Sequence, residues 1–264
     1  MFAKRLVKLV AAPAVICSCL VGITFLQLLK INDLANQAGT SQTYLKQEEF
    51  EKIRLTLFKR IPSLGFSNLI ADWSFLEFLQ YFGDDSARKA TGYSLAPDYF
   101  EAIVAHDPRF TQAYFYLSPA TSLYAGRPDL SVELIRQGLK SVSPDTSPNS
   151  YYLWLYKGTD EMLFLGKIVA AQHSFEMAAK WASVYNNPAA KQVAISAQQT
   201  AQFLAHNPSS KRAQVSAWMM ILGNAIDDHT RQLAIEHIKA LGGQVKITLQ
   251  MGIKEVRVQL PKED

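Results

Sequence analysis

Cysteine is scarce in this chain of 264 residues, which has only Cys17 and Cys19. Because no cysteine follows Cys19, the remainder of the chain can form no disulfide of its own and carries no clue to its redox compartment. The two cysteines lie within an apolar run, where we interpret them as small apolar residues rather than metal ligands.

Motifs that carry chemistry are also missing. The sequence has no Cys-x-x-Cys pair, glycine-rich phosphate loop or nucleophile elbow. Three of the five histidines, His106, His173 and His206, stand alone near predicted helix ends. His229 and His237 are too far apart on one predicted helix to bind one ion together. We therefore predict no catalytic residue, no cofactor and no metal site.

The part of the chain after residue 30 has no excess of positive charge. The whole sequence has 27 Lys and Arg against 23 Asp and Glu, and residues 1–30 contain four of the basic residues and none of the acidic ones. A body with balanced charge offers no electrostatic footprint for a phosphate backbone, which argues against a nucleic-acid partner.

An apolar run covers residues 7–29. About 20 apolar residues are enough to cross the hydrocarbon of a bilayer, so we predict a transmembrane anchor within residues 1–30. A cleaved secretory signal is one alternative, but the run is long and no small-x-small site follows it. A lipoprotein signal ending at Cys19 is another, but there the chain should turn polar, and residues 20–26 stay apolar.

Basic residues indicate the orientation of this anchor. Lys4, Arg5 and Lys8 precede the run, whereas Lys30 is the only basic residue after it until Lys46. The positive-inside rule then predicts a cytoplasmic N-terminus and a body on the exported side, periplasmic or lumenal.

The segments between the anchor and the main body are short. Polar residues 31–43 are predicted to be a linker, and residues 44–67 a connecting segment. Within it, i,i+4 charges favour a helix over residues 44–60, although Ile53, Leu55 and Leu57 alternate as in a strand.

Residues 68–82 are predicted to form an amphipathic helix. Its large apolar side chains are Leu69, Trp73, Phe75, Leu76, Phe78, Leu79 and Phe82. Ser74, Glu77 and Gln80 are expected to form a narrow solvated strip. So many large apolar groups on one helix predict nearly complete burial.

Asp72 shares the expected buried face of this helix. A buried carboxylate is costly unless it is paired, so we interpret Asp72 as a buried structural acid with a partner such as Arg54 or Arg60. The alternative is that burial raises the pKa of Asp72 and that this acid serves catalysis.

Signals that end helices recur along residues 68–242, which indicates a repeat. Their spacing leaves room for an additional helix near residues 191–206. Pro119 is expected to kink the helix that carries Tyr114. Four of the expected helices share a triplet pattern. A small residue at position i is followed by a large apolar residue at i+4 and by a small or apolar residue at i+7. The triplets are Ala96, Phe100, Ile103; Ser131, Ile135, Gly138; Ala171, Phe175, Ala178; and Ala234, Ile238, Leu241. An aromatic residue, Tyr114, Trp154 or Trp218, precedes each of the last three by 16 or 17 positions, one antiparallel helix earlier.

These triplets resemble the tetratricopeptide repeat (TPR), whose units are helix pairs with an aromatic residue on the first helix and a small-large-small triplet on the second. The resemblance implies an all-α, α-solenoid domain over residues 68–242. The tail at residues 243–264 alternates around Gly252 and is expected to form a small β-hairpin.

The run from Leu64 to Asp84 also resembles the opening of membrane-anchored repeat proteins of cyanobacteria. That resemblance implies an energy-transducing membrane, with the photosynthetic thylakoid as one candidate, and no reaction.

The repeat resemblance implies a protein-binding groove with Gln112, Phe115, Tyr152 and Thr159 facing it. We therefore expect a single-pass membrane scaffold that binds proteins, in the manner of an assembly or maintenance factor of a membrane complex. One alternative is a permanent accessory subunit of such a complex. The other is an enzyme of unrecognised type that uses Asp72.

Overall fold

The chain has an all-α fold with one small β-hairpin. The computed structural model describes residues 21–25, 27–28, 41–145, 147–206, 211–250 and 253–261. The chain divides into two compact units, Met1–Lys46 and Gln47–Asp264.

The predicted anchor lies largely outside the described residues. Within it, residues 21–25 and 27–28 are helical. No helix of the described residues is long and apolar enough to cross a membrane. Most of the predicted linker, up to residue 40, is also outside the described part, and its last three residues are already helical.

Helices account for most of the described chain. They are α2 (Ser41–Phe58), α3 (Ser67–Gly83), α4 (Asp85–Thr91), α5 (Ala96–His106), the 3₁₀ turn η1 (Thr111–Ala113), α6 (Tyr114–Ser118), the π-helix η2 (Pro119–Tyr124), α7 (Pro128–Gly138), α8 (Tyr151–Leu163), α9 (Ile168–Ala182), α10 (Pro188–His206), α11 (Lys211–Asn224) and α12 (Asp228–Ala240). The strands β1 (Gln244–Gln250) and β2 (Ile253–Gln259) follow.

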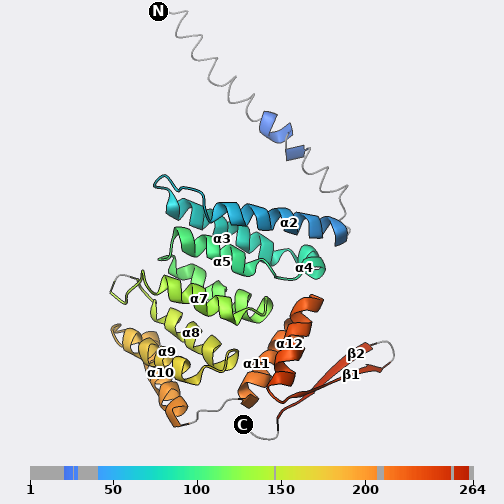
Figure 1. Cartoon of the computed structure of the whole chain (residues 1–264). Coiled ribbons are helices and arrows are strands. Elements are labelled where there is room, and N and C mark those ends of the chain that lie inside the picture. The colour runs from blue at the N-terminus through green and yellow to red at the C-terminus, as the bar shows by residue number, and fades with distance from the viewer. Residues whose placement is uncertain are drawn as a thin grey trace, which may run out of the picture. The chain divides into compact units, whose positions relative to one another are not determined.

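Helices that are close in sequence pack against one another. In the unit Gln47–Asp264, α3 contacts α5, α7 contacts α8, α8 contacts α9, α9 contacts α10, and α11 contacts α12 (Figure 1). The helix predicted near residues 191–206 is α10, and the helix predicted over 44–60 is α2. The all-α prediction is confirmed.

The small residues of the triplets occupy the tightest helix contacts. Ala96, Ser131, Ala171 and Ala234, which begin the four triplets, are all fully buried. Gly138 shows why size matters, because a Cβ atom added there would lie 2.0 Å from the hydroxyl oxygen of Tyr114. The aromatic residue one helix earlier therefore packs where the triplet is small, as the sequence pattern indicates.

Pro119 interrupts its helix as predicted. The α-helical turn α6 ends at Ser118, and η2 continues the chain as a π-helix. Proline has no N–H and its ring clashes with the preceding turn, so the regular α-helical hydrogen-bond pattern cannot pass through it. The wider turn ends with the Ala125 N–H donating to the Ala120 carbonyl at 3.0 Å.

The prediction of nearly complete burial for α3 is wrong. Leu69, Trp73 and Leu76 are 64%, 55% and 54% exposed, and Leu79 is exposed as well. Ser74, predicted to be solvated, is completely buried. The reason is that α3 is apolar around most of its circumference, so its sequence pattern does not determine which side packs.

Aromatic contacts with α5 select the buried side of α3. Phe78 is fully buried, with its ring centroid 4.5 Å from that of Phe100 and 6.0 Å from that of Tyr99. The Tyr81 ring is tilted against that of Tyr99 with centroids 5.1 Å apart, and the Tyr81 hydroxyl accepts the N–H of Leu95 at 3.1 Å. These interlocking rings fix the rotation of α3 and turn the aliphatic stripe outwards.

Asp72 is therefore not a buried structural acid. It lies on the outward side of α3 and is exposed. The proposed partner Arg54 pairs with Glu77 instead, and Arg60 is exposed. The misassignment follows directly from the inverted face of the helix.

The C-terminal hairpin is confirmed. Strand β1 pairs antiparallel with β2, and the register places Val245 opposite Val258. Both valines pack against the buried residues of α11 and α12. Gly242, with φ of +86°, ends α12 in the left-handed conformation that glycine adopts without strain.

Candidate protein-binding surface

The structure brings together two of the four predicted groove residues. The rings of Phe115 on α6 and Tyr152 on α8 meet edge to face at 5.2 Å. Gln112 is exposed on η1, and the Thr159 hydroxyl donates to the Leu155 carbonyl of its own helix at 2.9 Å. Gln112 and Thr159 are therefore outside this ring contact.

One further tyrosine of α8 extends this contact. The Tyr156 ring lies 6.1 Å from Phe115 and 6.3 Å from Tyr152. Tyr116, the neighbour of Phe115 on α6, is half-exposed and makes an edge contact with Phe75 of α3 at 5.4 Å instead. We call Phe115, Tyr152 and Tyr156 the aromatic face.

The aromatic face can bind both apolar and polar groups. Its three side chains are partly exposed, and two of them have phenol hydroxyls. Burial raises the pKa of Tyr156, so its hydroxyl stays neutral at physiological pH. Rigid rings with a hydrogen-bonding edge are the side chains that dominate protein–protein interfaces.

A buried carboxylate holds the helices that carry this face. Asp160 of α8 is 1% exposed and accepts hydrogen bonds from three serines on neighbouring elements. Ser118 of α6 donates at 3.1 Å, Ser122 of η2 at 2.8 Å and Ser131 of α7 at 2.6 Å. One side chain thus links α8 to α6, η2 and α7.

Burial changes the acidity of this carboxyl group. It raises the pKa of Asp160 to about 7, although the hydrogen bonds from the three serines favour the charged form and lower it. Because the serine hydroxyls point their protons at Asp160 and the group is closed to solvent, the arrangement offers no nucleophile to a substrate. Its geometry is that of a structural link between helices.

A second buried cluster lies one turn away and links α8 to α9. The Lys157 ammonium is 2.5 Å from the Glu161 carboxylate and donates to Ser174 at 3.0 Å. Ser174 in turn donates to Glu161 at 2.6 Å. Each charged group is paired and hydrogen-bonded, which is the condition for burying an ion pair without a large penalty.

Sequence reasoning missed both clusters. The triplet pattern marks Ser131 only as a small residue, and Asp160 and Glu161 give no signal of burial in the sequence. The spacing of Ser118 and Ser122 on one helix face could have suggested a shared acceptor, but naming Asp160 requires knowing which helices are neighbours.

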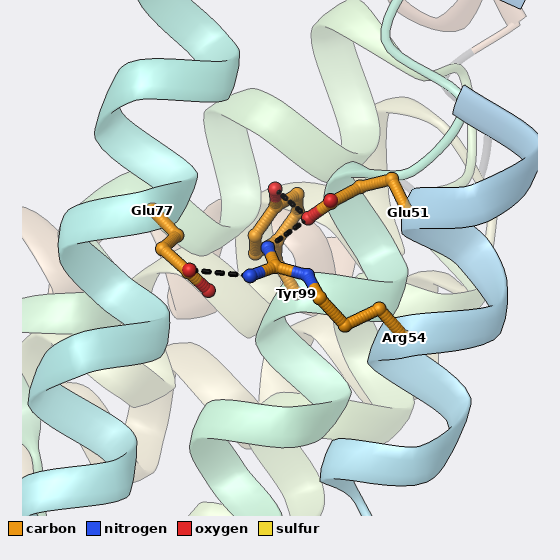
Figure 2. A network of polar contacts seen from close by, with 4 residues as sticks. All are labelled: Glu51, Arg54, Glu77 and Tyr99. Carbon is orange, nitrogen blue, oxygen red and sulfur yellow. Dashed lines mark hydrogen bonds and ion pairs between the residues drawn. The ribbon is translucent and has the colours of Figure 1, made fainter. Parts of the chain in front are cut away.

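A third polar network, at the partly buried contact of α2, positions that helix (Figure 2). Arg54 donates to Glu77 of α3 at 2.5 Å and also pairs with Glu51 of its own helix. Tyr99 of α5 donates to Glu51 at 2.5 Å, and both its burial and this hydrogen bond raise the pKa of its phenol. The network ties α2 to both α3 and α5.

Among the described residues, no three His, Cys, Asp or Glu side chains are arranged to hold a metal ion. Comparison with protein-family models, with curated proteins and with solved structures finds no match to this chain.

Proposed function

We propose that this chain is a membrane-tethered scaffold of the tetratricopeptide-like class, which binds a partner protein during assembly or maintenance of a membrane complex. The tether is the apolar run at residues 7–29, with the body on the exported side. The likeness of the opening of the body to cyanobacterial proteins makes a photosynthetic membrane the first place to look for the partner.

The observation that carries the proposal is the aromatic face. Partly exposed Phe115, Tyr152 and Tyr156 lie on α6 and α8, the first helices of consecutive pairs, and their rings contact one another. Aromatic side chains lose little conformational entropy on binding, so they suit a docking site. Beneath them, Asp160 and its serines hold α6 and α8 in a fixed arrangement, which lowers the ordering cost of association.

The test is affinity capture from gently solubilised membranes, with partners identified and counted. We expect the Phe115→Ala/Tyr152→Ala variant to recover the partner at least ~10-fold less than the unmodified chain, since central aromatic anchors are typical hot spots. Phe203→Ala is the matched control, because Phe203 is an exposed aromatic residue on α10, outside this face. Equal recovery by the double variant and the control would refute the aromatic face as the docking site.

Counting the captured proteins separates the scaffold from the accessory subunit. A scaffold leaves when an assembly step ends, so it should be substoichiometric in the mature complex. A constant one-to-one ratio in the purified complex would instead identify a permanent subunit.

A further inference from the structure

The helical hairpin α2–α3 exposes an unusual number of large apolar side chains. Phe50, Ile53 and Leu57 on α2 are 71%, 60% and 60% exposed, and the turn between the helices adds Leu64 and Phe66, also exposed. Leu69, Trp73 and Leu76 continue the set on α3. We call these eight residues the apolar cap. A contiguous apolar surface of this kind marks an interaction site.

The polar network of Figure 2 shows that both helices turn their apolar stripes to the same side. On α2, Arg54 gives the direction to α3 and Glu51 the direction to α5. Successive residues are rotated by about 100° around the axis of α2. Going around the axis from Glu51 to Arg54 and further in the same sense, one reaches Phe50, Leu57 and Ile53, so these three point away from α5.

The same construction places the stripe of α3. Glu77 gives the direction from α3 to α2, and Phe78 marks the buried side towards α5. Around the axis of α3, Trp73, Leu69 and Leu76 lie next to Glu77, on the side opposite to Phe78. The two stripes are therefore neighbours across the α2–α3 contact.

This outward orientation is firmly fixed. Besides Arg54 and Glu51, the Lys59 ammonium pairs with Asp98 at 3.0 Å and with Glu101 of α5, and His106 bonds the Phe58 carbonyl at 2.7 Å. In α2, Leu55 is buried, and Glu51 and Arg54 contact the rest of the protein, as does Lys59 just after the helix. The apolar stripe of Phe50, Ile53 and Leu57 faces out. An ordinary amphipathic helix buries such a stripe.

We propose that the apolar cap lies in the surface of the lipid bilayer, so that the hairpin α2–α3 rests on the membrane. The proposal rests on the membrane tether of the proposed function. Residues 30–40 separate the apolar run from α2, and a fully extended chain of that length spans at most about 40 Å. A tethered chain therefore holds α2 within reach of the lipid.

The chemistry of the cap fits a lipid interface better than a specific protein pocket. Aromatic Phe50, Phe66 and Trp73 stand among aliphatic side chains, the mixture typical of helices that lie in the interfacial region. Nearby exposed charges have both signs, such as Lys52 and Asp72. Apolar insertion, rather than attraction to anionic lipid, is thus the expected mode of contact.

The experiment uses the full chain with Cys17→Ala and Cys19→Ala, reconstituted in phosphatidylcholine vesicles. Single Ile53→Cys or Leu76→Cys variants carry the environment-sensitive dye NBD on the cap. Val169→Cys and Ile195→Cys are matched controls at exposed apolar positions of α9 and α10. Circular dichroism verifies equal helix content in all four proteins.

The cap positions should lose most of their NBD fluorescence when the vesicles contain a lipid with a nitroxide near its headgroup, and should be shielded from aqueous iodide. The two control positions should show the opposite response. Cap positions that are shielded from iodide without quenching by the labelled lipid would mean that protein covers them, and the proposal would be wrong.

Vesicle flotation distinguishes a failure of the membrane tether from a failure of the lipid contact of the apolar cap. Protein that floats with the vesicles while positions 53 and 76 respond like the controls overturns the proposal and leaves the tether standing. Protein that does not float overturns both the tether and the proposal.

Discussion

The hairpin α2–α3 and the group α6–α8 both depart from the usual arrangement of apolar side chains inside and polar side chains outside. The hairpin has apolar side chains outside, whereas the group α6–α8 has an acidic side chain inside. At α2–α3, apolar side chains face out and Arg54, Glu51 and Glu77 mediate a partly buried helix contact. At α6–α8, the carboxylate of Asp160 is fully enclosed by serines.

The difference lies in how much each polar group depends on its partners. At α2 the side chains of Arg54, Glu51 and Glu77 are 37%, 24% and 15% exposed, so water can partly replace a lost partner. Asp160, by contrast, is closed to solvent. We expect the buried cluster to dominate stability, and the outward apolar residues to matter for what the protein touches rather than for how it folds.

The largest effect is expected for Asp160→Ala. Truncation leaves three buried serine hydroxyls without an acceptor and opens a void, so the free energy of unfolding should fall by about 3–5 kcal/mol. Urea denaturation of the full chain in mild detergent, followed by circular dichroism, measures this. Asp160→Asn, which keeps the size and one carbonyl acceptor, should lose less. Equal losses would mean that the hydrogen bonds are unimportant.

The next prediction concerns pH. The pKa of Asp160 is about 7 in the folded chain and ordinary, about 4, in the unfolded chain. Between these values the folded state holds a proton that the unfolded state releases, so this contribution to stability is complete below about pH 4 and is lost as the pH rises through 7. Between pH 5 and 8 we expect a loss of about 3 kcal/mol.

Asp160→Asn supplies the control for this pH dependence, because the amide does not titrate. Thermal unfolding at a series of pH values should give a fall in Tm for the unmodified chain that is much smaller in the variant. Parallel curves for the two proteins would contradict the assignment to Asp160.

A smaller effect is expected at the partly buried network. Arg54→Met removes the contacts to Glu51 and Glu77, which keep some exposure to water, so the loss should be about 1–2 kcal/mol, and less at high salt. Lys52→Met, at an exposed cation of the same helix, should cost nothing measurable. A loss for Arg54→Met as large as that for Asp160→Ala would erase the distinction between the two regions.

The smallest effect is expected on the outward face of α3. Leu76→Ser should change the free energy of unfolding by less than ~0.5 kcal/mol, because Leu76 is 54% exposed. Phe78→Ala, two residues away on the buried side, should cost about 3–5 kcal/mol. Comparable losses from the two substitutions in the same denaturation assay would show that the face of α3 is assigned wrongly.

Much of the fold could be predicted from local patterns. Pro119 interrupts the regular α-helix in which it stands, Gly242 suits the end of a helix, and Ala96 and Gly138 mark places where another helix comes close. Each of these effects depends on one residue and its own backbone or size. For the candidate site, the repeat resemblance predicted a groove of Gln112, Phe115, Tyr152 and Thr159, but only Phe115 and Tyr152 share the ring contact.

The sequence by itself indicated that most of the chain is helical and where several helices break, because proline, glycine and periodicity act within a few residues along the chain. Only the tertiary structure decided that Leu76 faces out while Phe78 faces in, and that Asp160 meets three serines. Those outcomes depend on which helices are neighbours, and the free energy that selects them arises between segments that are distant in sequence.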